Sequence, residues 1–136
     1  FHWQVENSAR FQKICQIFAK RAHPAHDWEV RPEVFDDKGV QFLETGNNFR
    51  DIVIMDELGR FELKAFEFQK KVFEIMDSPK PVLAVVKDEK NEFLDKVRNR
   101  KDKSMYRVKS KNHETVFENI YQELRDIMES INKNRE

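Results

Sequence analysis

Two short apolar runs, at residues 51–55 and 81–86, are the clearest structural signals in the chain. Both contain β-branched residues, and their hydrophobicity is continuous rather than alternating, which indicates strands buried on both faces, as in a parallel sheet. Between them, residues 61–76 place a wide apolar stripe at helical spacing. The pattern therefore predicts a strand–helix–strand unit with parallel strands.

Helices are also predicted on both sides of this unit. Residues 31–46 have Pro32 at the first helical position and Gly46 at the expected end. Residues 88–98 predict a second helix, for which Asp88 is the expected N-cap. These helices, alternating with strands, place the chain in the α/β class, with a mostly parallel sheet flanked by helices in three layers.

The two ends of the chain complete the pattern. Residues 104–108 alternate and predict a strand near a sheet edge, and Asn112 is a suitable N-cap for a last helix. The apolar residues at positions 1, 3 and 5 alternate as in a strand, which is compatible with a β-hairpin over residues 1–22. Helical spacing fits the apolar residues of positions 11–18 equally well, so the pattern leaves hairpin and helix open.

Length and charge narrow the class of protein. The 136 residues are enough for a single domain, 1–136, with one core. The 25 Lys and Arg balance the 25 Asp and Glu, which argues against a dedicated nucleic-acid binder. A hydrophobic share of 39% that includes twelve Phe is too large for a disordered chain. No apolar run is long enough to span a membrane, and one cysteine favours a reducing compartment, so we expect a cytoplasmic protein.

Two adjacent acids follow the first predicted strand directly. Asp56 and Glu57 would lie at the carboxyl end of that strand, where open α/β sheets bind ligands. Neighbouring residues of an extended chain point to different sides, so one carboxylate can hold a hard cation while the other orients or deprotonates a water molecule. This is the Walker B arrangement of nucleotide hydrolases. A simple helix cap after a strand explains a bare pair of acids about as well.

The longer string Asp56-Glu57-Leu58-Gly59-Arg60-Phe61-Glu62-Leu63 resembles the signature of the thermophile-type nucleoside-triphosphatase family, whose human member is the cancer-related nucleoside-triphosphatase. These are small P-loop enzymes of the RecA-like class. The similarity covers roughly residues 28–125, most clearly 50–86, and it favours the hairpin for the first residues. It identifies residues 50–63 as the Walker B segment, and it implies hydrolysis of ATP, GTP and related nucleoside triphosphates with Mg²⁺.

The resemblance also implies roles for individual residues. Asp56 would secure Mg²⁺ through its hydration shell, and Glu57 would be the base. Arg60 stands where the family usually has Lys and is a candidate for charge stabilisation, and Glu62 matches the second acid of the signature. Asn112, a candidate for nucleotide binding, matches a family Asn that is normally followed by Arg and Asp, whereas His113 and Glu114 follow here. In an enzyme of this kind, Arg100 of the basic segment 98–103 is a candidate for phosphate binding, although such a run is more often a solvated loop.

The phosphate-binding loop of that family is absent from these residues. The chain has three glycines, none of which precedes a Lys-Ser or Lys-Thr pair. We expect either the carboxyl-terminal part of a longer enzyme, without its first strand, P-loop and helix, or a non-catalytic binding or scaffold module that has lost the loop. The start at Phe1 rather than Met favours the first. In either case an open sheet edge could support self-association.

Other candidate sites are weaker. His23 and His26, followed by Asp27, could contribute to a metal site, although Pro24 between them makes a loop the more natural interpretation. Cys15 lies in an apolar pattern and is better interpreted as a small buried hydrophobic residue than as a nucleophile.

Overall fold

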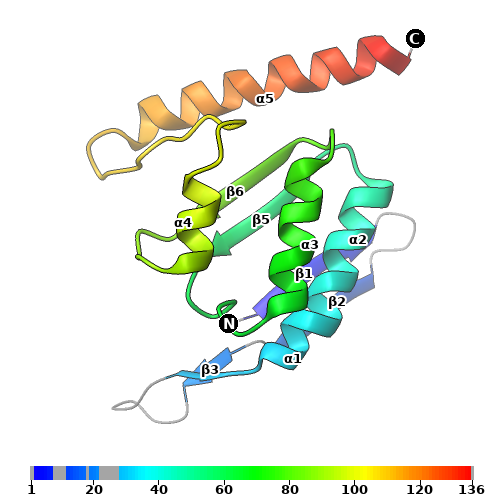
Figure 1. Ribbon diagram of the computed structural model, residues 1–136. Helices are drawn as coiled ribbons and strands as arrows, with labels where there is room; N and C mark the ends of the chain where they lie inside the picture. The colour runs from blue at the N-terminus through cyan, green and yellow to red at the C-terminus, as the bar shows by residue number, and fades with distance from the viewer. Residues whose placement is uncertain (1, 8–11, 18, 22–27, 136) are drawn as a thin grey trace. The chain divides into compact units, whose positions relative to one another are not determined.

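The computed structural model divides the chain into two compact units, residues 1–98 and 99–136 (Figure 1). It describes residues 2–7, 12–17, 19–21 and 28–135, with side chains from Val30 onward. Within these ranges no helix is long and apolar enough to cross a membrane. Each unit is described by itself below.

The first unit begins with two antiparallel strand pairs. Strand β1 (His2–Asn7) pairs with β2 (Gln12–Ile17), and β3 (Ala19–Arg21) pairs with β4 (Trp28–Val30). The backbone over residues 12–17 is therefore extended, not helical. Cys15 lies in β2, and the candidate metal ligands at positions 23, 26 and 27 lie outside the described residues.

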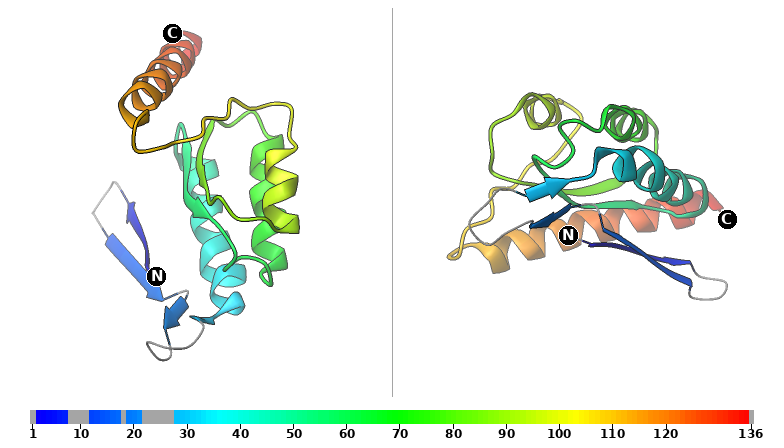
Figure 2. Two further views of the ribbon diagram at one scale, coloured as in Figure 1. Left: turned by 90° about the vertical axis from the view of Figure 1, so that its left-hand side faces the viewer. Right: turned by 90° about the horizontal axis from the view of Figure 1, so that it is seen from below.

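A strand–helix–strand unit forms the centre of the first unit. Strand β5 (Val53–Leu58) and strand β6 (Val82–Val86) are parallel, and α3 (Phe66–Asp77) connects them. Helix α3 is preceded by α1 (Pro32–Val34), the π-helix η1 (Phe35–Gly39) and α2 (Val40–Phe49), and β6 is followed by α4 (Glu92–Arg98). The predicted α/β class, with a parallel sheet flanked by helices, is confirmed (Figures 1 and 2).

One face of this sheet carries the hydrophobic core. The predicted burial on both faces is wrong, because Ile54 and Val85 on the opposite face are exposed. Val53, Met55 and Leu58 of β5 are buried with apolar residues of η1, α2, α3 and α4. The aromatic rings pack edge to face, with centroids 5.4 Å apart for Phe35 and Phe68 and 5.7 Å apart for Phe73 and Phe93. Such edge-to-face pairs add to the stabilisation from burial alone. The core thus fixes β5, and with it the residues that follow Met55.

Several predicted boundaries are wrong. The first strand, predicted at 51–55, extends over Val53–Leu58, so that Asp56 and Glu57 lie within it rather than after it. Helix 31–46 continues to Phe49, with Gly46 inside α2. Residues 61–64 form a turn, so α3 begins only at Phe66. Helix α4 begins at Glu92, where Asn91 rather than Asp88 is the cap, because its Oδ1 accepts the Leu94 N–H at 2.8 Å.

The second unit consists of a loop and α5 (His113–Arg135), which begins directly after Asn112 as predicted. The predicted strand at 104–108 is wrong, because these residues form neither strand nor helix. Instead, the Tyr106 hydroxyl donates a hydrogen bond of 2.8 Å to Glu123 of α5. An alternating pattern alone cannot supply the neighbouring strand that pairing requires.

Candidate functional site

The two acids of the signature lie on an irregularity of β5. Met55 pairs with Ala84 and Leu58 pairs with Val86, so that Asp56 and Glu57 together lie opposite Val85 alone. Two residues against one define a β-bulge, a feature that bends the strand and is common beside active sites. The bulge is at the carboxyl end of β5, the edge at which the sequence predicted the site.

Glu57 has a left-handed backbone conformation. Its φ is 59°, and no other non-glycine residue in the described part of the chain has a positive φ. For an L-residue this conformation costs about 1–2 kcal/mol, because Cβ approaches the following carbonyl oxygen. Backbone strain of this kind concentrates at functional sites and is maintained by the surrounding structure. The strained residue is the one that the sequence predicted to be the base.

Oppositely charged side chains alternate around Glu57. The Lys87 Nζ lies 3.7 Å from Glu57 Oε1 and 3.4 Å from Glu89 Oε1, and an Arg60 nitrogen lies 3.9 Å from Glu89 Oε1. All four side chains are partly exposed, so each ion pair is weak by itself. Together they place Glu57 and Arg60 in one network, in which Lys87 and Glu89 are the linking residues. Neither of these two was predicted as a site residue from the sequence.

The loop after β6 is held from α4. The Arg98 guanidinium donates hydrogen bonds of 2.6 Å to the carbonyl oxygens of Lys87 and Glu89, and it pairs with Asp95 at 3.2 Å. Arg98, which the sequence placed in a basic surface segment, thus fixes the backbone of both Lys87 and Glu89. The sequence contained a signal for Lys87, because this residue directly follows β6, at the sheet edge where ligands of open α/β sheets bind.

Glu62 is a buried acid beside the same bulge. Its side chain is 1% exposed, and its Oε2 accepts the Gly59 N–H at 3.0 Å. The pKa of Glu62 is raised to about 7, chiefly by burial, because a low-dielectric environment disfavours the carboxylate, with the charges of Glu57 and Glu89 acting in the same direction. The Gly59 N–H acts in the opposite direction. Glu62 therefore titrates near neutral pH.

Asp56 is the most accessible acid of the bulge. Its side chain is exposed and forms no hydrogen bond or ion pair with any residue that the structure describes. Across residues 30–135 no group of three or more His, Cys, Asp or Glu could hold a metal ion. One carboxylate still fits Mg²⁺, since this ion usually binds one or two carboxylates and takes its remaining ligands from water and substrate phosphates.

The remaining candidate residues lie in the second unit and make local contacts there. The Arg100 guanidinium pairs with both carboxylate oxygens of Asp102, at 2.9 and 2.5 Å. The Asn112 side chain donates to the Arg107 carbonyl oxygen at 3.0 Å and accepts the Lys109 N–H at 2.6 Å. Both side chains thus have hydrogen-bond partners within their own loop.

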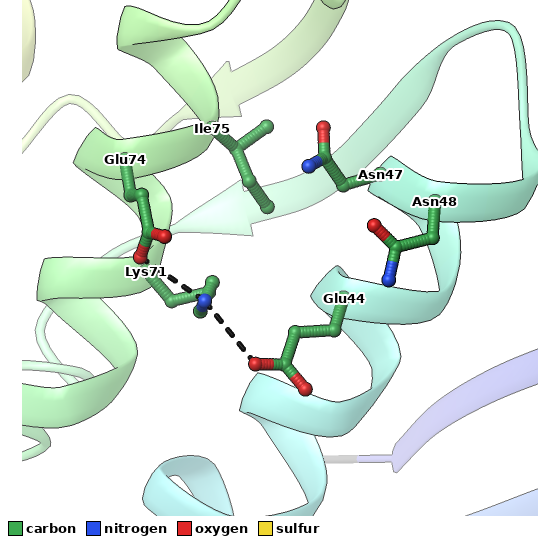
Figure 3. Close-up of a pocket in the computed structure, with 6 residues that line it drawn as sticks. All are labelled: Glu44, Asn47, Asn48, Lys71, Glu74 and Ile75. Carbon is green, nitrogen blue, oxygen red and sulfur yellow. Dashed lines mark ion pairs between the residues drawn. The ribbon is translucent and has the colours of Figure 1, made fainter.

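A separate pocket of about 200 Å³ lies between α2 and α3 (Figure 3). Lys71 reaches into it and pairs with Glu44 at 3.2 Å and Glu74 at 3.0 Å, while Asn47 and Asn48 line the opposite side. These parts of α2 and α3 lead into the amino ends of β5 and β6. The pocket is therefore distant from the bulge along the strands and shares no residue with it.

Comparison with known proteins identifies relatives for the part of the chain that carries these features. The chain is 34% identical to the nucleoside-triphosphatase THEP1 of Thermotoga maritima over 82 residues. This alignment covers 60% of this chain and 47% of that protein. It is 35% identical to the THEP1 nucleoside-triphosphatase of Methanocaldococcus jannaschii over 89 residues. This second alignment covers 65% of this chain and 49% of that protein. The chain thus spans about half the length of these curated relatives. No solved structure matches it.

The match to a protein family covers more of the chain than these pairwise alignments do. The model of the family described as NTPase matches residues 6–121, which include the bulge, the charged network around Glu57 and the buried Glu62. The resemblance inferred from the signature string is confirmed, and the chain belongs to the NTPase family.

Proposed function

We propose that the protein hydrolyses nucleoside triphosphates such as ATP and GTP, with Mg²⁺, in the cytoplasm. The observation that carries this proposal is the pair Asp56 and Glu57 on a bulge at the carboxyl end of β5, with Glu57 in a strained conformation. Membership of the NTPase family and the names of the relatives support it.

Each acid has a distinct role in this proposal. Glu57 accepts a proton from the attacking water, or orients that water towards the γ-phosphate. Asp56, which is exposed, holds Mg²⁺ through its hydration shell, and Mg²⁺ supplies neutralisation of phosphate charge. Arg60 and Lys87 can compensate negative charge that develops beside Glu57, because both already pair with acids of the network.

Phosphate positioning is the part of the reaction that these residues do not supply. The 136 residues contain no Gly-rich loop ending in Lys-Ser or Lys-Thr. In P-loop enzymes that loop holds the β- and γ-phosphates, and positioning is most of what phosphoryl transfer requires of a protein. We therefore assign hydrolysis to the protein encoded by the complete reading frame that contains this chain.

The test replaces Glu57 with Gln in the protein from that reading frame. Gln has nearly the same shape but cannot accept the proton, so kcat for phosphate release should fall by at least about 100-fold, the lower end of general-base contributions. The dissociation constant for Mg·ATP should stay unchanged. Glu67→Gln, an exposed acid of α3, is the matched control and should leave kcat unchanged. An unchanged kcat in the Glu57 variant would refute the role of Glu57 as base.

A second candidate function is a non-catalytic module that binds a partner or a second copy of the chain. The observation that favours it is the β5–β6 face opposite the core, where Ile54 is 62% and Val85 is 53% exposed. Each strand of this described two-stranded sheet also has an unpaired edge. Absence of phosphate release from the complete protein, together with concentration-dependent association, would favour this module.

A further inference from the structure

The peptide group that joins Leu58 to Gly59 is held at both of its polar ends. Its carbonyl oxygen accepts the Lys87 N–H at 2.9 Å, directly after the last residue of β6. Its N–H donates to Glu62 Oε2 at 3.0 Å. Because a peptide group is planar, two bonds on its opposite sides fix the orientation of the whole plane. This plane lies one residue beyond Glu57.

The residue that supplies this acceptor, Glu62, is itself held in place through its backbone. Glu62 is buried, and its backbone carbonyl accepts the Ala65 N–H at 3.0 Å and the Gln69 side-chain amide at 2.6 Å. Both donors lie at the start of α3, which packs in the core. The side chain of Glu62 therefore connects the rigid helix α3 to the backbone that follows the bulge.

The choice of a carboxylate at this buried position requires an explanation. A neutral acceptor would satisfy the Gly59 N–H, and burying an acid is costly unless its charge is compensated. An ionised acceptor, however, makes a shorter and stronger hydrogen bond than a neutral one. The groups that act on Glu62 electrostatically are Glu57 and Glu89, and Lys87 forms ion pairs with both of them.

We propose that Glu62 is a positioning residue, which holds the Leu58–Gly59 peptide so that Glu57 keeps its left-handed conformation and its direction towards substrate. This proposal rests on the proposed function for its catalytic consequence only. The geometric part, in which Glu62 controls the backbone of Glu57, concerns this chain alone. Gly59 itself does not require the conformational freedom of glycine, since its φ is not positive.

The geometric part is tested by NMR on the chain as it stands. Its three glycines make the Gly59 amide simple to assign. In the wild type, the chemical shifts of Gly59 and Glu57 should titrate together with a midpoint near pH 7. In Glu62→Gln this titration should disappear, whereas the control Glu67→Gln should retain it. Persistence of the titration in Glu62→Gln would overturn the proposal.

A second variant, Glu62→Met, removes the acceptor and keeps the volume. In the folded variant, hydrogen exchange of the Gly59 amide should accelerate by about tenfold or more, the loss of one hydrogen bond, and the Glu57 Cα shift should leave its left-handed value. Unchanged Glu57 shifts would overturn the proposal. If Glu62→Met does not fold, the pH titration of Glu62→Gln still tests whether Glu62 controls the backbone of Glu57.

Hydrolysis by the protein from the complete reading frame tests the catalytic consequence. Glu62→Met should lower kcat by about tenfold without raising KM, and Glu62→Gln should restore part of the loss. In a Glu57→Gln background the Met substitution should have no further effect, because Glu62 acts through Glu57. An equal loss in both backgrounds would overturn the positioning role. Absence of hydrolysis in the wild type would instead refute the proposed function and leave the NMR result standing.

Discussion

At the scale of single residues, Glu57 combines backbone strain with the chemistry of the site. Its left-handed conformation is stabilised by the bulge, by the peptide plane beyond it and by Lys87. Ordinary surface positions do not keep such strain, because substitution by glycine or asparagine removes it at little cost. A glutamate at this position is therefore best explained by what its carboxylate does.

This strain predicts a difference in stability between two substitutions that both remove the carboxylate of Glu57. Glu57→Gly should be more stable than Glu57→Ala by about 1 kcal/mol, because both lose the carboxylate and only glycine adopts a positive φ without strain. The partly exposed ion pair with Lys87 contributes little and is lost equally in both variants. Urea denaturation of the two variants measures the difference. Equal free energies of unfolding would mean that the conformation is not strained.

The raised pKa of Glu62 predicts a second effect, on stability against pH. The folded state binds the proton more tightly than the unfolded chain, because the pKa rises from 4.5 to about 7 on folding. Stability should therefore fall as the pH rises from about 5 to about 8, by about 3 kcal/mol if no other group compensates. Urea denaturation of wild type and Glu62→Gln at both pH values isolates this contribution. A difference between the two proteins that does not change with pH would contradict it.

At the scale of elements, α3 begins with a cap that comes from elsewhere in the chain. Its N-cap residue, Ala65, has no side-chain acceptor. The Oδ1 of Asp36, in the π-helix η1, accepts the Phe68 N–H at 3.0 Å instead. Phe68 is the third residue of α3 and one of the first four N–H groups, which lack partners within the helix. This bond joins two segments 32 residues apart in sequence.

Removal of this remote cap should destabilise the first unit. Asp36→Ala should lower the free energy of unfolding by about 1 kcal/mol, the usual effect of losing an N-cap acceptor. Asp37→Ala is the control, because Asp37 lies in the same π-helix and forms only exposed bonds, such as that with Gln41. Asp36→Asn should recover most of the loss, since its amide oxygen can accept. Equal effects of the two alanine substitutions, measured by urea denaturation, would exclude a capping role.

Prediction from sequence succeeded for elements with a local hydrophobic pattern and failed where the structure depends on remote contacts. The short apolar runs rich in β-branched residues predicted β5 and β6, although the burial on both faces that they indicated is wrong, since Ile54 and Val85 are exposed. The start of α3 was misplaced because its cap lies in η1 and residues 61–64 are held in a turn. The strand at 104–108 failed because alternation does not determine whether a partner strand is present.

The sequence predicted which acids lie near the end of the strand, but not the conformation of the backbone that carries them. The rule that ligands bind beyond the carboxyl ends of strands placed Asp56 and Glu57 after the strand, whereas both lie in the last part of β5. The bulge, the positive φ and the burial of Glu62 depend on pairing with β6 and on packing, so residue spacing could not reveal them. Arg98 was assigned to a solvated segment because its two carbonyl acceptors belong to a loop about ten residues earlier in the chain.

At the scale of the whole molecule, acidic and basic residues are equal in number, and the cations of the site are already paired with acids. The chain has 25 basic and 25 acidic residues, and around the bulge Lys87 and Arg60 already pair with Glu57 and Glu89. A triphosphate would have to compete with these carboxylates for the same cations. No backbone loop of the phosphate-binding type is present in the sequence to offset this.

The chain by itself should therefore not bind Mg·ATP with useful affinity. A ligand bound only by the folded state adds about 2.7 kcal/mol at a hundredfold excess over its dissociation constant, which shifts the melting temperature by several degrees. We expect no shift for residues 1–136 with millimolar Mg·ATP, and a clear shift for the protein from the complete reading frame. A clear shift in the chain alone would show that its own residues hold the phosphates. Lys87→Gln and Arg60→Gln would then identify which cation is responsible, since substitution of that cation should abolish the shift.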